Sequence, residues 1–168
     1  MGARMLEQFG QSDEINFGDI PETTNAILQQ GVVAYQRDHH RADAFFRQAL
    51  QSAPAVLPVY YCLYKIHTYQ GNLDAALAAA QDGLTEAARQ AGLPGDWRAW
   101  PAPASAPAGA GRFALYTLKA LAFIHLRRNE PGLALEKLQS LQRLDPAGLV
   151  GWPVIADLAN AVHAATSC

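Results

Sequence analysis

The stretch 118–146 most constrains what this chain can fold into, because it has the pattern of two amphipathic helices joined by a break. Leu118, Leu121 and His125 recur at spacings of three and four residues, which places them on one face of a helix. A second apolar stripe with the same spacing begins at Ala134, after an Arg-Asn-Glu-Pro-Gly break. Neither helix can bury its stripe alone, so the stretch predicts a helical hairpin that packs against further helices.

The same hairpin pattern precedes this stretch twice. We expect three units, at about 24–55, 57–91 and 114–146, and no strand pattern is apparent. After them, a helix over 148–165 carries an apolar face, made of Val154, Leu158 and Ala161, that could cover the last hairpin. The sequence therefore predicts an all-α protein with one helical domain over residues 23–165.

A segment rich in proline, alanine and glycine, residues 92–112, separates the second and third units. Four prolines and four glycines in it argue against a long helix. Trp97 and Trp100 favour partial order, because two indoles left in water are unfavourable. The chain begins with an arm, residues 1–22, that we expect to be partly ordered; the Met1–Arg4 start leaves open whether the natural start is Met1 or Met5.

The spacing between units resembles a known family. Ala42 and Ala76 are 34 residues apart, and Ala134 follows after the same period lengthened by the insert. A 34-residue helix-turn-helix period is typical of the tetratricopeptide repeat family, and the resemblance covers about residues 25–146. It implies a right-handed α-solenoid of antiparallel hairpins.

Composition narrows the classes of partner and compartment. Of the 168 residues, 50% are hydrophobic, and 13 Lys and Arg face 15 Asp and Glu, for a net charge of −2 without a basic block. Nucleic acid is therefore not an expected partner. No apolar run is long enough to predict membrane insertion. The two cysteines, Cys62 and Cys168, do not suggest a disulfide framework, so we expect a cytoplasmic protein.

No motif in the chain indicates catalysis, a cofactor or a metal. His67 and His125 occupy equivalent positions in the second and third units, which favours a role in packing between helices over ligation. The spacings HExxH and CxxC are missing, and Cys62 lies on a different helix face from His67. We expect a binding protein rather than an enzyme, with no cofactor.

The resemblance implies that the first helices of the units line a concave groove that binds a peptide of a protein partner. Three cations among the matching positions, Lys65, Lys119 and Arg127, indicate a partner with acidic character. The asparagines of the family's carboxylate clamp are missing from the second and third units, which argues against a chaperone tail as the partner. The predicted groove residues are Tyr35, Tyr61, Lys65, Tyr69, Tyr116, Lys119, Phe123 and Arg127.

Two roles follow. In the first, the protein is an adaptor or chaperone that holds a peptide in this groove. In the alternative, it is a structural, self-associating repeat protein whose groove is filled by its own Pro-rich insert or by a second copy in a homodimer.

Overall fold

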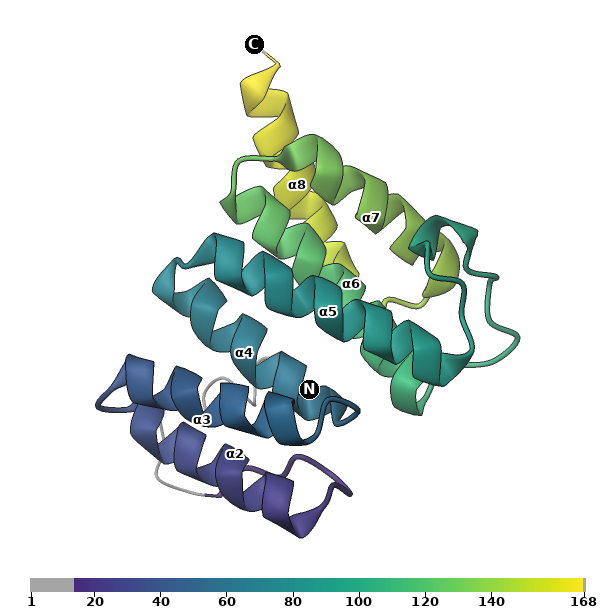
Figure 1. The fold of residues 1–168 in the computed structure, drawn as a ribbon. Helices are drawn as coiled ribbons and strands as arrows, with labels where there is room; N and C mark the ends of the chain where they lie inside the picture. Colours follow the sequence, from purple (N-terminus) through teal and green to yellow (C-terminus); the bar gives the residue numbers. More distant parts are fainter. Residues whose placement is uncertain (1–13, 168) are drawn as a thin grey trace.

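The computed structural model describes residues 14–167, and all regular secondary structure in this part of the chain is helical, which confirms the predicted all-α class (Figure 1). Residues 1–13, with the two candidate starts, and Cys168 lie outside it. The elements are α2 (Glu22–Tyr35), α3 (His39–Ser52), α4 (Leu57–Gln70), α5 (Leu73–Ala91), the 3-10 helix η1 (Trp97–Ala99), α6 (Gly109–Arg127), α7 (Pro131–Leu144) and α8 (Trp152–Thr166).

Short local signals separate the helices within each hairpin. The Asp38 side chain accepts a hydrogen bond from the Arg41 amide and caps the beginning of α3. Gly71 ends α4 in the left-handed conformation, with φ of 78°, which glycine adopts without strain. Pro131 begins α7, where its missing N–H is not needed.

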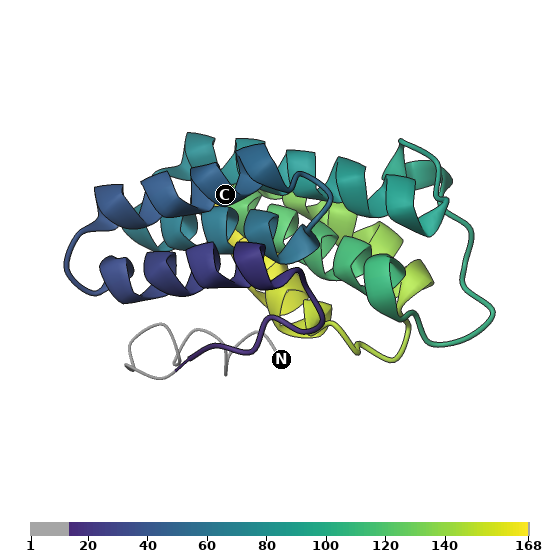
Figure 2. The same cartoon turned by 60° about the horizontal axis from the view of Figure 1, so that its bottom comes forward.

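The six helices of the three hairpins form two layers. Figure 2 shows α3, α5 and α7 in one layer, which we call the outer layer, and α2, α4 and α6 in a second, the inner layer. Residues 14–20 and the beginning of α8 lie on the side of the inner layer that faces away from the outer layer. We call that side the inner face. Helix α8 packs against α6 and α7.

The core lies mainly between the two layers, and the predicted stripes form it. Leu118, Leu121 and His125 on α6 are buried. The predicted stripe on α7, Ala134, Leu138 and Leu141, is buried as well. In the second hairpin the facing residues of α5 are small and buried, and Gly83 lies directly over Tyr60 of α4. Small residues allow these two backbones to approach closely.

The insert is shorter than expected. Helix α6 already begins at Gly109, within the predicted insert and before the predicted unit boundary at 114, so only residues 92–108 lack an α-helix. Gly109, the first residue of α6, has φ of 54°, which glycine adopts without strain. The low helix propensity of glycine is tolerated here because tertiary packing stabilises the helix. The expected partial order is present, since Trp97 and Trp100 are buried and η1 spans the first of them.

The last helix differs from expectation in its start and in its buried face. Helix α8 begins at Trp152 because both carboxylate oxygens of Asp145 accept hydrogen bonds from the amides of Leu149 and Val150, which holds a loop there. Val154 and Leu158, predicted to cover the last hairpin, are 72% and 45% exposed. The apolar periodicity of α8 allowed two faces, and packing uses the one that includes Ala159.

Candidate functional site

Four of the predicted groove residues meet where α4 and α6 lie side by side. Tyr61 and Lys65 are one turn apart on α4, and Tyr116 and Lys119 are one turn apart on α6. The two tyrosine ring centroids are 5.9 Å apart. The Lys119 amine lies 3.9 Å from the centroid of the Tyr116 ring, and the Lys65 amine lies 5.5 Å from it. We call these four residues the Lys–Tyr cluster.

Both amines of the cluster are partly desolvated. Burial lowers the pKa of Lys65 to about 8, and the positive charge of Lys119 contributes to this shift. Burial likewise lowers the pKa of Lys119 to about 8. None of the ion pairs formed by residues 14–167 includes either amine. Cation–π contacts with the rings of Tyr61 and Tyr116 therefore stabilise these two charges in place of ion pairs.

The tyrosine hydroxyls of the cluster have unmet hydrogen-bonding capacity. Within residues 14–167, the buried hydroxyl oxygens of Tyr61 and Tyr116 have no hydrogen-bond partner at ordinary distance and angle. They are near enough to affect one another's acidity, and burial raises the pKa of Tyr116 to about 12 and that of Tyr61 further. An unpaired buried hydroxyl is unfavourable by about 1–3 kcal/mol, so an oxygen acceptor placed here would be stabilised.

The other four predicted groove residues lie in a more open region. Arg127 is exposed, and its guanidinium lies 6.0 Å from the centroid of the half-buried Phe123 ring. Tyr69 is 56% exposed, and its pKa is raised by burial and by Tyr35 and lowered by Arg127, which indicates that these side chains are near one another. Tyr35 stacks on His39 with ring centroids 4.7 Å apart.

Residues 14–20 contribute a contact that the sequence did not predict. Ile15 and Phe17 are buried, and the Gln29 side chain of α2 pairs with the backbone of Ile15 at both ends: the Ile15 amide donates to Oε1 at 3.1 Å, and Nε2 donates to the Ile15 carbonyl at 2.7 Å. The Asn25 side chain accepts a second hydrogen bond from the same nitrogen. Two amides four residues apart on one helix face are the signal that could have indicated this site.

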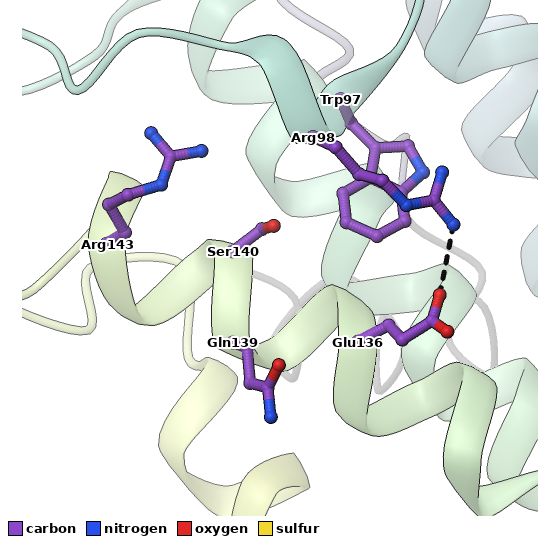
Figure 3. Close-up of a pocket in the computed structure, with 6 residues that line it drawn as sticks. All are labelled: Trp97, Arg98, Glu136, Gln139, Ser140 and Arg143. Atoms are coloured by element: carbon purple, nitrogen blue, oxygen red, sulfur yellow. Dashed lines mark hydrogen bonds and ion pairs between the residues drawn. The ribbon is translucent and has the colours of Figure 1, made fainter.

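The Pro-rich insert contacts the outer layer. The Arg143 guanidinium of α7 donates to the Trp100 carbonyl at 2.7 Å, and Arg98 pairs with Glu136 at 3.0 Å. Figure 3 shows Trp97 and Arg98 facing a row of α7 side chains across a shallow pocket of about 320 Å³. These contacts place the described tryptophans of the insert on α7, away from the Lys–Tyr cluster.

The two buried histidines each have a carboxylate partner. His67 Nε2 lies 2.6 Å from Asp43 of the neighbouring helix, and His125 Nδ1 lies 2.7 Å from Glu130. Both histidines are buried among the helices, as the packing prediction requires. Within residues 14–167, no three His, Cys, Asp or Glu side chains gather closely enough to hold a metal ion.

Comparisons with known proteins do not assign the chain to a family: it matches no family model, no curated protein and no solved structure. Over the described residues, none of the helices is both long and apolar enough to cross a membrane.

Proposed function

We propose that this chain is a tetratricopeptide-like protein, a right-handed α-solenoid, that binds a peptide segment of a protein partner along its inner face. In this role it acts as an adaptor or chaperone. The eight residues carried over from the family resemblance would line the groove, with α4 and α6 contributing most of them.

The observation that carries the proposal is the pairing of Gln29 with Ile15. Through it, the inner layer binds an extended segment of its own chain by backbone hydrogen bonds, with Ile15 and Phe17 buried and the intervening Asn16 exposed. A backbone amide and carbonyl are present in nearly every peptide, so this contact is independent of sequence. Alternate apolar side chains then supply the selectivity, as in other complexes of extended peptides.

Aromatic and basic side chains on α4 and α6, the other two helices of the inner layer, support the same role. Tyr116 and Phe123 are half-buried, and Tyr69 and Arg127 are exposed. Aromatic residues and arginine are enriched at the centres of protein interfaces, where they contribute much of the binding energy.

The test is selection of peptides from a display library with the full chain, followed by affinity measurement. Phe123→Ala combined with Arg127→Glu should weaken binding of the selected peptides at least tenfold. The matched control, Gln139→Ala combined with Arg143→Ala on the outer layer, should leave the affinity unchanged. Circular dichroism would establish that both variants are folded. Equal binding by the wild type and the inner-face variant would overturn the proposal.

The alternative role is self-association with a second copy on the inner face. It predicts that the wild type is dimeric in light scattering and that the inner-face variant is monomeric. The version in which the chain's own insert fills the groove has no supporting contact among the described residues, because Trp97 and Trp100 pack near α7.

A further inference from the structure

We propose that the Lys–Tyr cluster is an oxyanion site, which binds an acidic side chain of the peptide held on the inner face. The geometry behind this is the pair of ammonium groups over the Tyr116 ring, which itself lies 5.9 Å from the Tyr61 ring, together with the buried hydroxyls of these two tyrosines. The inference rests on the proposed function for the source of the anion. The site itself can be tested without a peptide.

The polar groups of the cluster include more hydrogen-bond donors than acceptors, because only the two tyrosine oxygens can accept. Each ammonium group donates up to three hydrogen bonds and accepts none, and each tyrosine hydroxyl has a proton to donate. Tyr61 is only 5% exposed, so water cannot readily satisfy its hydroxyl. Among the described residues no carboxylate pairs with either ammonium group, and a carboxylate or phosphate oxygen would supply the missing negative charge and acceptors.

The beginning of α8 adds positive potential to the same place. The Lys119 amine lies 3.8 Å from the position that a β-carbon on Gly151 would take, and Gly151 directly precedes the first residue of α8. No side chain of the described residues caps this helix, so its first amides keep their partial positive charge. A cation beside an uncapped helix N-terminus is unfavourable without an anion between them.

A third partly buried lysine provides the contrast. Lys137 on α7 also lies over an aromatic ring, with its amine 5.3 Å from the centroid of Trp97. Its amine is however within 3.5 Å of the Leu133 carbonyl, and Glu136 is a nearby charge of opposite sign. Lys137 therefore has a carbonyl and a carboxylate nearby, whereas no ion pair within residues 14–167 includes Lys65 or Lys119.

The charge state at neutral pH suits the proposed role. With pKa values of about 8, both amines are mostly protonated at pH 7, although their mutual repulsion lowers that of Lys65. A bound anion would relieve this repulsion. The unliganded site is thus destabilising for the fold, which is common for groups kept for binding.

The first experiment uses acetate and inorganic phosphate as probes at pH 7, with chloride at matched ionic strength as the reference. We expect saturable shifts of the Gly151 and Trp152 amide signals in nuclear magnetic resonance spectra of the full chain. Lys65→Met and Lys119→Met should each weaken this binding at least tenfold, and the control Lys137→Met should not. Absence of saturable shifts, or equal binding by all four proteins, would overturn the proposal.

Thermal unfolding separates binding from a structural role. If the amines exist to bind an anion, Lys65→Met should raise the melting temperature of the unliganded protein while it weakens anion binding. A lower melting temperature together with unchanged anion binding would mean that Lys65 serves packing, and the proposal would fail.

The second experiment uses the peptides selected on the inner face. Replacing their acidic residue by glutamine should weaken binding to the wild type at least tenfold, and should change binding to Lys65→Met little. Replacement by phosphoserine distinguishes a phosphate source from a carboxylate source, because the favoured anion gives the tighter complex. The selected peptides could instead lack acidic residues and bind wild type and Lys65→Met equally. This outcome would overturn the oxyanion site, and the proposed peptide binding on the inner face would stand. Saturable binding of acetate or phosphate, with no peptide selected on the inner face, would support the oxyanion site and overturn the proposed peptide binding.

Discussion

Replacing Gly83 by alanine tests the close packing of α4 and α5 on which the inner layer depends. A β-carbon at this position would lie 2.8 Å from Cβ and 3.2 Å from Cγ of Tyr60. The near atom is a Cβ, which cannot swing away by a change of rotamer. The two helices must therefore separate by some tenths of an ångström to admit the new methyl group.

Two opposing effects set the expected magnitude. Alanine is favoured over glycine in a helix interior by about 1 kcal/mol. Overpacking of a filled core costs typically about 1–3 kcal/mol. We expect Gly83→Ala to lower the free energy of unfolding by about 0–2 kcal/mol as the difference of these effects.

The matched control is Gly132→Ala near the beginning of α7, where a β-carbon meets no other atom within 4 Å. It should be neutral or stabilising by up to about 1 kcal/mol. Urea unfolding followed by circular dichroism measures both variants. If Gly83→Ala stabilises the protein, the added methyl group meets no overpacking, and the reasoning from the close approach of α4 and α5 is refuted.

Three further changes test other parts of the fold. Leu121→Ala should cost about 2–5 kcal/mol in urea unfolding, because Leu121 is 1% exposed; a loss below about 1 kcal/mol would contradict its place in the core. In a Cys168→Ser variant, Cys62 should react with a thiol reagent only after denaturation, because it is fully buried and burial raises its pKa; rapid labelling of the native protein would contradict this. Burial lowers the pKa of His125 although Glu130 opposes the shift, so the unfolded chain binds a proton more readily and stability falls as the pH drops below about 6.5. A His125→Gln variant should lose part of this dependence, and an unchanged slope of stability against pH would show that His125 does not cause it.

Local patterns were sufficient to predict the hairpins. The apolar spacing in each helix, the glycine after α4 and the proline at the beginning of α7 depend on residues close together in the chain, so periodicity and turn chemistry indicate them directly. The predicted burial of Leu121, His67 and His125 follows from the same periodicity.

Helix ends and faces were predicted less well where local signals were ambiguous. Gly109 suggested a break, yet α6 begins there, because packing of a long amphipathic helix outweighs the low propensity of one glycine. In α8 two apolar faces compete, and only contact with α6 and α7 decides that Val154 stays exposed and Ala159 is buried.

In the candidate site too, some features follow from the local sequence and others only from tertiary packing. The sequence by itself determined that Tyr61 and Lys65 share one helix face and that Tyr116 and Lys119 share another, because the helical period is a local property. Only the tertiary structure decided that the two pairs meet, that their tyrosine hydroxyls are buried without an ordinary hydrogen bond to any described residue, and that Gln29 holds Ile15. Those facts depend on how helices distant in the chain pack, since desolvation and unpaired donors arise only when separate helices exclude water together.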